Sequence, residues 1–295
     1  MRRIVAVTVV LLCVLSAAAL VRSPAPADGR PATAACTSGP EHLNVRTAGV
    51  LTIGTDNPAY SPWFGGGQLG DSVFKINDPK TGKGFESSVA YNVAAYMGVN
   101  PADVRWVYVP FNKAFAPGPK SFDFDINQIS YTPARAKVVT FSASYYNVNQ
   151  AIVVVKGTPI ANVHTIAGLR AFKLGAQLGT TSYQYIVSKI KPSQQPSVFP
   201  KNDAAVQSLK NKQIDGLVVD LPTAFYVTAV QVPKSKILGQ FPSPPGGEHF
   251  AMVFRKGNPL VRCVNEALAH LKKTGTLARI QQTWLAKSTG APVLR

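Results

Sequence analysis

One arginine in this chain has a residue type and a setting that could do chemistry. Residues 122–135 begin as an alternating apolar run, typical of a buried strand, and then reach Thr132 followed by Pro133. Threonine is a preferred helix N-cap and proline suits the first helical position, which places Arg135 in the first helical turn. Backbone N–H groups at a helix start and a guanidinium both favour an anion. The local chemistry therefore predicts an anion site, most naturally for a carboxylate; the alternative is a surface arginine beside an ordinary cap.

Polar residues also stand at two other predicted element boundaries. Thr180 and Thr181 follow Gly179 where a helix is expected to begin. Asp220 ends an apolar strand and precedes a proline that can open another helix. Taken alone, both patterns also fit plain helix caps, which use the same residue types.

The patterns of catalytic and metal sites are missing from the sequence. The histidines are dispersed, without the HExxH motif or another metal-ligand spacing. The G-x-S-x-G elbow, the phosphate-binding loop and the G-x-G-x-x-G turn do not occur, and no set of nucleophile, base and orienting residue can be assembled. The sequence therefore predicts no catalytic residue, no metal and no cofactor.

Strands and helices alternate along the chain, which predicts the α/β class. Apolar alternation and β-rich runs predict strands at 51–55, 105–110, 122–130, 138–141, 149–155, 171–177, 213–220 and 250–254. Helical spacing and capping signals predict helices at 86–98, 182–190, 203–210, 258–272 and 275–284. Residues 65–83 are rich in glycine and lysine and predict an exposed loop or hairpin.

The first 35 residues predict export. Met1, Arg2 and Arg3 precede an uncharged apolar run at 4–21, and small residues at 32–34 offer a cleavage site. The segment 1–35 is thus expected to contain a signal peptide or an N-terminal anchor together with a spacer that ends before Cys36. The formal net charge is +17, but the lysines and arginines form no run interleaved with aromatic residues. This distribution indicates a solvated basic surface and no nucleic-acid partner.

Cys36 and Cys263 are expected to form a disulfide. Cys13 lies inside the apolar N-terminal run and leaves with it if that run is cleaved. Two cysteines, an even number, then remain in an oxidising compartment, which favours a disulfide. The alternative is that Cys36 carries a lipid, because the residues just before it are small.

Several motifs occur in the order found in one protein family. They are the loop from Gly54 to Phe64, the Gly84-Phe85-Glu86 triplet, the S-x-T-P-x-R stretch that ends at Arg135, and the closing helix that ends at Trp284. Together they resemble amino-acid-binding proteins of ABC importers, the bacterial extracellular solute-binding proteins of family 3. The resemblance runs from residue 50 to the last helix.

This resemblance implies a two-lobed type II periplasmic-binding-protein fold. Each lobe would be a central mixed sheet flanked by helices, and two hinge crossings would join the lobes. Lobe one would contain residues 46–148 and 251–295, and lobe two would contain residues 149–250.

The resemblance also implies roles for particular residues. Arg135 and the amide of Ser130 would hold the carboxylate of an amino acid, and Thr180 and Thr181 would add donors from lobe two. The partners of the ammonium would be Asp220 and Gln128. The residues that pack on the ligand's side chain would be Tyr60 and Trp63.

The function implied is capture of an amino acid by hinged closure and delivery to an ABC permease, without enzymatic activity. The protein would be a monomer exported to the periplasm or the cell surface, with or without a membrane tether. One alternative is a periplasmic dehydratase of the same fold, acting on prephenate- or arogenate-like acids. Another is a ligand-sensing receptor.

Overall fold

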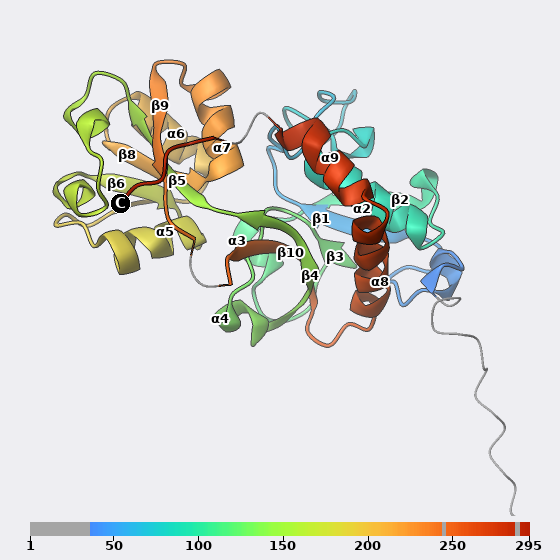
Figure 1. Cartoon of the computed structure of the whole chain (residues 1–295). Coiled ribbons are helices and arrows are strands. Elements are labelled where there is room, and N and C mark those ends of the chain that lie inside the picture. The colour runs from blue at the N-terminus through green and yellow to red at the C-terminus, as the bar shows by residue number, and fades with distance from the viewer. Residues whose placement is uncertain (1–35, 244–245, 287–289) are drawn as a thin grey trace, which may run out of the picture.

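The described part of the chain forms two lobes that lie side by side (Figure 1). The computed structural model describes residues 36–243, 246–286 and 290–295. The predicted signal peptide or anchor at 1–35 lies outside the described residues. Within the described ranges, no helix is both long and apolar enough to cross a membrane.

Lobe one is built on a five-stranded sheet. Its strands, in spatial order, are β2 (Val104–Tyr108), β1 (Leu51–Thr55), β3 (Phe124–Asp125), β10 (Glu248–Arg255) and β4 (Val139–Val148). β1 pairs in parallel with β2 and β3, whereas β10 runs antiparallel to β3 and β4. The sheet is therefore mixed, as predicted.

Lobe two repeats this layout in its own five-stranded sheet. Its strands, in spatial order, are β7 (Ser197–Phe199), β6 (Leu174–Gln177), β8 (Gly216–Asp220), β5 (Gln150–Val155) and β9 (Ser235–Gln240). β6 pairs in parallel with β7 and β8, and β5 runs antiparallel to β8 and β9. The fourth strand is β10 in the sheet of lobe one and β5 in the sheet of lobe two. Each of them begins just after the chain has crossed from the other lobe. These strands, β5 and β10, mark the two hinge crossings.

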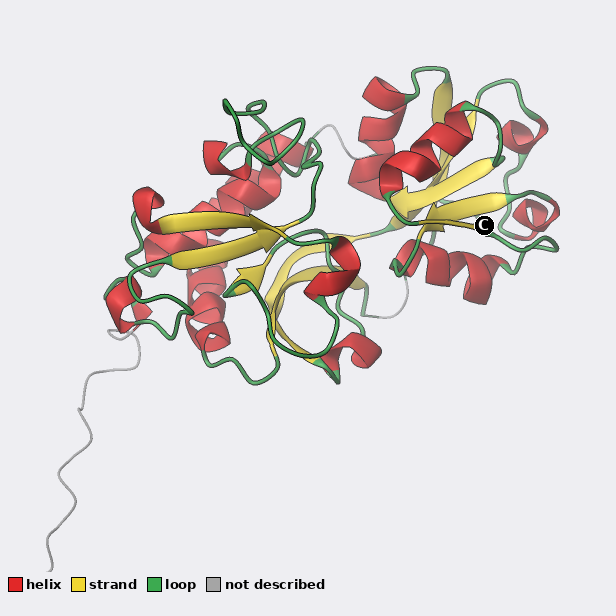
Figure 2. Ribbon diagram, turned by 180° about the vertical axis from the view of Figure 1, so that it is seen from behind, coloured by secondary structure: helices red, strands yellow, loops and turns green. Residues whose placement is uncertain are grey.

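Helices cover both sheets (Figure 2). The helices of lobe one are α2 (Phe85–Tyr96), α3 (Phe111–Ala114), α4 (Pro133–Ala136), α8 (Leu260–Lys273) and α9 (Thr276–Leu285). The helices of lobe two are α5 (Thr181–Tyr185), α6 (Asn202–Lys210) and α7 (Leu221–Tyr226), and π-helical turns extend α5 over Ile186–Ile190 and α7 over Val227–Gln231. Short 3-10 helices lie at Pro40–His42, Pro79–Thr81, Pro101–Asp103, Pro159–Asn162 and Ala167–Ala171.

The main core of lobe one lies between its sheet and helices α2, α8 and α9. β1 is buried along its whole length. Val89 and Val93 on α2, and Val264 and Leu268 on α8, are fully buried because they recur at a spacing of four residues on one helical face. Burial of apolar surface stabilises by roughly 25 cal/mol per Å². This packing holds the strand ends and their loops in place at the cleft.

The predicted disulfide is confirmed. Cys36 is bonded to Cys263, and their Cα atoms are 5.1 Å apart. Cys263 lies on α8, so the bond fastens the start of the described chain to lobe one. Because its sulfur forms this bond, Cys36 has no thiol left to carry a lipid.

The C-terminal tail corrects one predicted domain boundary. The sequence assigned 251–295 to lobe one, but residues 290–295 lie against β9 of lobe two (Figure 1). The N–H of Gln240 donates to the carbonyl of Pro292 at 2.7 Å, and the N–H of Leu294 donates back to Gln240 at 2.9 Å. The side chain of Leu294 is buried in a lobe-two core. Residues 290–295 therefore belong structurally to lobe two.

One strand is much shorter than predicted. The apolar pattern predicts strand 122–130, but β3 contains only Phe124 and Asp125. Gln128 has a φ of 48°, in the left-handed region, so the extended strand cannot continue through it. The chain then forms only an isolated bridge between Ser130 and Phe250.

The glycine- and lysine-rich insertion is partly packed and forms no hairpin. In residues 65–83, Phe74 is buried and the amide of Asn77 donates to the carbonyl of Ala59 at 2.8 Å. Val73 remains exposed. The long-range contacts were not predicted, and they hold the insertion against lobe one.

Candidate functional site

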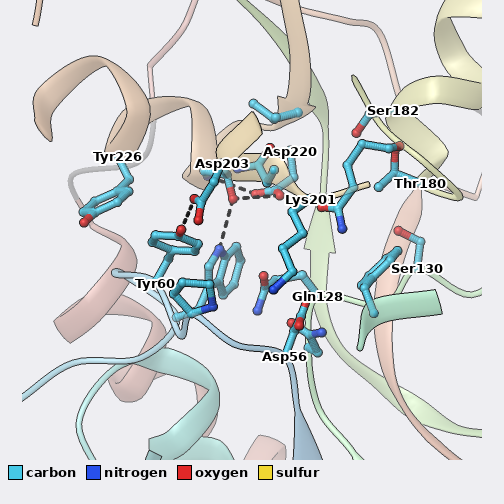
Figure 3. A pocket seen from close by; sticks show the side chains of 18 of the residues that line it. Asp56, Tyr60, Gln128, Ser130, Thr180, Ser182, Lys201, Asp203, Asp220 and Tyr226 are labelled. Carbon is cyan, nitrogen blue, oxygen red and sulfur yellow. Dashed lines mark hydrogen bonds between the residues drawn. The ribbon is translucent and has the colours of Figure 1, made fainter. Parts of the chain in front are cut away.

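A cavity of about 110 Å³ lies between the lobes. Loops that follow the parallel strands of both sheets line it, as is usual for α/β sheets, whose ligands bind at the carboxyl ends of the strands. All of the predicted ligand-binding residues line this one cavity: Tyr60, Trp63, Gln128, Ser130, Arg135, Thr180, Thr181 and Asp220. Figure 3 shows how the side chains converge from both lobes.

Arg135 is held firmly at one wall of the cavity. The hydroxyl of Thr132 accepts from the N–H of Arg135 at 3.2 Å, so the predicted cap is present. The guanidinium donates to the carbonyl of Ser130 at 2.6 Å and, across the cleft, to the carbonyl of Gly179 at 2.8 Å. It also stacks on Phe115, with 4.1 Å from the guanidinium carbon to the ring centroid. This is no surface arginine.

The charge of Arg135 persists at neutral pH. Burial lowers the pKa of its guanidinium to about 10, and the nearby carboxylate of Glu248 opposes this shift. Both carbonyl bonds use only part of the N–H donors of the fork, so further donors remain for an anion.

The two threonines at the start of α5 differ in what they can offer. Thr180 is the N-cap: its hydroxyl accepts from the N–H of Tyr183 at 3.1 Å and donates to the carbonyl of Gln177 at 2.7 Å. That hydroxyl is therefore used within the turn. Thr181 instead directs its hydroxyl to Glu248 at 2.6 Å.

Asp220 is the N-cap of α7, as one of its two predicted roles requires, and it also lines the cavity. Its carboxylate accepts from the N–H of Thr223 at 3.0 Å and from the hydroxyl of Thr223 at 2.8 Å. Burial raises the pKa of Asp220 to about 6, although the bonds from Thr223 work against this rise. A desolvated carboxylate of this kind is stabilised by a cation in the cavity.

Gln128 is oriented by a buried acid beneath it. Its backbone N–H donates to Glu86 at 2.6 Å, and its side-chain amide also donates to Glu86. The hydroxyl of Tyr145 donates a third hydrogen bond to the carboxylate of Glu86 at 2.5 Å. Burial nevertheless raises the pKa of Glu86 to about 7. With its nitrogens bound to Glu86, Gln128 has carbonyl oxygens left to offer, and oxygen acceptors suit an ammonium.

The two predicted aromatic residues occupy different settings. Tyr60 is half-buried, donates to Asp203 of lobe two, and lies 6.1 Å from the ring of Tyr226 (Figure 3). Trp63 is almost fully buried among Phe85, Tyr146 and Phe250, so most of its ring serves packing. Its indole N–H donates at 3.1 Å to the hydroxyl of Thr223, and this hydrogen bond crosses the cleft.

Several cavity groups were missed by the sequence analysis. Lys201 and Asp203 follow β7, a three-residue strand too short to predict. Figure 3 shows Lys201 extending toward Asp56, whose pKa is raised by burial and lowered in part by that lysine. Glu248 was also missed: it is the first residue of β10, behind the lining, and its carboxylate bonds to the lining residue Thr181. Only its place before the apolar run 250–254 could have drawn attention.

The arrangement defines a class of protein. A guanidinium on one wall and a carboxylate on the other, with hydroxyls and aromatic rings between them, suit a small ligand of mixed charge. A cavity of this kind between two lobes is typical of binding proteins that close about a hinge.

The chain belongs to the bacterial extracellular solute-binding proteins, family 3, whose model matches residues 71–287. The L-cystine-binding protein TcyJ of Escherichia coli strain K12 is 25% identical over 81% of this chain and 84% of its own length.

Solved structures show the same fold. An ancestral arginine-binding protein bound to arginine is 29% identical, with a TM-score of 0.64, over 80% of this chain and 98% of its own. An ancestral amino-acid-binding protein described as a precursor of cyclohexadienyl dehydratase is 27% identical, with the same TM-score, over 80% and 95% of the two chains. The predicted type II periplasmic-binding-protein fold is confirmed.

Proposed function

We propose that this chain is an extracytoplasmic solute-binding protein that captures an amino acid between its lobes. An α-amino acid carries a carboxylate and an ammonium on neighbouring atoms, and each needs a charged or multiply hydrogen-bonded partner once it leaves water. The observation that carries the proposal is that Arg135 and Asp220 supply opposite charges to one cavity from different lobes.

The other cavity residues take the roles that their contacts allow. The carboxylate would be held by the guanidinium of Arg135, by the amide and the hydroxyl of Ser130, and by the hydroxyl of Thr181. The ammonium would be held by Asp220 and an oxygen of Gln128. The ligand's side chain would pack against Tyr60 and the edge of Trp63 that lines the cavity, while Thr180 fixes the helix start beside them.

Binding would favour the closed arrangement of the lobes. A ligand that touches both walls has more contacts in the closed form than in an open one, and this difference in affinity drives closure. Delivery to an ABC permease is supported by relatives that are named as arginine- and glutamine-binding proteins of ABC transporters.

The test is a thermal-shift screen followed by calorimetry. L-Cystine and L-arginine come first, because proteins that bind them are among the relatives and structural neighbours, and the remaining common L-amino acids follow. The best ligand is then compared with its analogue lacking the amino group and its analogue lacking the carboxyl group. Both analogues should bind far more weakly. If no amino acid raises the melting temperature, the proposal fails.

The setting of this function would be outside the cytoplasm. A disulfide fits an oxidising compartment, and the family is described as extracellular. We expect residues 1–35 to direct export, the rest to act as a monomer, and the permease to be its membrane partner. N-terminal sequencing of the protein from cells and light scattering of the purified chain check the first two points.

A dehydratase is the second candidate, because a carboxylic acid with a raised pKa faces the cavity. The pKa of Asp220 near 6 would allow it to act as a general acid. One structural neighbour is described as a precursor of such an enzyme. Incubation with prephenate and arogenate, followed by product analysis, tests this candidate. Amino-acid binding is favoured because the named relatives are binding proteins.

A further inference from the structure

Glu248 directs its carboxylate at the same hydroxyls that the proposed function assigns to the ligand's carboxylate. The hydroxyl of Ser130, in lobe one, donates to Glu248 at 2.5 Å. The hydroxyl of Thr181, in lobe two, donates to the same oxygen at 2.6 Å. Both hydroxyls belong to residues that line the cavity.

Each hydroxyl has a single hydrogen to donate. Ser130 and Thr181 also lie 3.3 Å from one another, but their contacts with Glu248 are shorter and charge-assisted, so the hydrogens go to the carboxylate. While Glu248 holds them, both hydroxyls can only accept. A second carboxylate cannot be bound by groups that only accept.

The carboxylate of Glu248 is held in position by neighbouring side chains. Gln150, which is 5% exposed, donates its amide to the carboxylate at 3.1 and 3.2 Å. The hydroxyl of Ser182 donates to the amide oxygen of Gln150 at 2.6 Å, which fixes the orientation of that amide. Gln150 and Glu248 are the first residues of β5 and β10, the strands at the two hinge crossings.

We propose that Glu248 is an internal competitor for the ligand's carboxylate and, at the same time, a latch between the lobes. Its carboxylate joins Ser130 of lobe one to Thr181 and Gln150 of lobe two, and an incoming amino acid must displace it to gain the two hydroxyl donors. Glu248 thereby sets the affinity of the site, and the competition part of this inference rests on the proposed function.

Replacement of Glu248 separates this role from a supporting one. With the competitor removed, Glu248→Ala should bind L-arginine, L-cystine or whichever common amino acid the screen identifies roughly threefold more tightly or better, since charge-assisted hydrogen bonds no longer have to be broken. The affinity for the decarboxylated analogue should change less. Glu41→Ala, an exposed acid in lobe one, is the control for lost charge. Unchanged or weaker amino-acid binding in Glu248→Ala overturns the inference.

A double-mutant cycle distinguishes competition for donors from simple charge repulsion. Ser130→Ala should weaken amino-acid binding more in the Glu248→Ala background than in the wild type, because only there is the hydroxyl freely available to the ligand. Additive losses would mean that Glu248 acts through its charge alone, and the competition would be refuted.

The latch has a readout that needs no ligand. Small-angle scattering of the protein without added amino acid should give a larger radius of gyration for Glu248→Ala than for the wild type, and Glu248→Gln should lie between them. An equal radius in all three overturns the latch. If no amino acid binds the wild type but the radius increases, the proposed function fails while the latch stands. Thermal unfolding of each variant verifies that it is folded.

Discussion

The two lobes place a capped helix start at the same point of the same sheet layout, yet they present opposite charges. β3 and β8 are both third in their sheets, next to the antiparallel crossing strand. Each leads to a helix with proline in its first turn, α4 after Thr132 and α7 after Asp220. In lobe one the cap is neutral and Arg135 carries the charge, whereas in lobe two the cap itself is charged. One local structure can therefore serve either end of a dipolar ligand.

The lobes also differ in how their chain ends are fastened. In lobe one, the disulfide joins Cys36 to α8. In lobe two, the tail at 290–295 lies beside β9 and buries Leu294. The covalent bond constrains the unfolded chain as well as the folded one, whereas the tail acts only through contacts of the folded state.

The largest expected effect is the loss of ligand affinity in Arg135→Ala. Removal of one partner of a buried charge pair typically costs about 2–5 kcal/mol, and here the bond to Gly179 across the cleft is lost as well. Arg135→Lys should fall in between, because it keeps the charge but not the two-pronged geometry. Calorimetry measures both, with the exposed Arg105→Ala as control. Wild-type affinity in Arg135→Ala would move the carboxylate site elsewhere.

Removal of the disulfide should lower stability almost as much. Cys36 and Cys263 are 227 residues apart, and loss of a native disulfide usually costs about 2–5 kcal/mol. Urea unfolding of the Cys36→Ser, Cys263→Ser double variant measures this. Addition of a reductant should lower the unfolding midpoint of the wild type but not that of the double variant. Equal midpoints for wild type and variant would show that lobe one does not need the bond.

Asp220→Asn should weaken amino-acid binding by about 2–3 kcal/mol, since a desolvated ammonium loses its charged partner. Asparagine is also a good N-cap, so α7 should remain folded. Because the pKa of Asp220 is about 6, the wild-type affinity should decline as the pH falls through 6 and the carboxylate is protonated. The asparagine variant should show no such decline in calorimetry from pH 5 to 8. A parallel pH profile in both would remove Asp220 from the ammonium site.

The smallest effect concerns the tail. Leu294 is 4% exposed. Leu294→Ala should lower the unfolding free energy of the protein by about 2 kcal/mol, which is near the lower end for a buried leucine because the tail can relax around the smaller side chain. Val293 is its matched control: it is 57% exposed, and alanine there should change stability by less than about 0.5 kcal/mol. Denaturant unfolding of Leu294→Ala and Val293→Ala measures both changes in stability. Equal values would mean that the tail does not fasten lobe two.

The sequence by itself determined the features that depend on neighbouring residues. The caps at Thr132 and Asp220 each bond to an N–H three positions later, so residue type and spacing were sufficient to predict both helix starts. The order of strands and helices followed from apolar periodicity. The disulfide was predicted from the number of cysteines in a chain expected to be exported, which requires no knowledge of the distance between them.

Only the tertiary structure decided which distant groups meet. Ser130 and Glu248 are 118 residues apart, and no local pattern indicates that the hydroxyl of one bonds to the carboxylate of the other. The same holds for the bond between Trp63 and Thr223 and for the return of Leu294 to lobe two. Residue type limits what a side chain can bind, but the packing of two sheets and their crossings selects the partner. For this reason the charges of the site were predicted, whereas the carboxylate that competes for its hydroxyls was not.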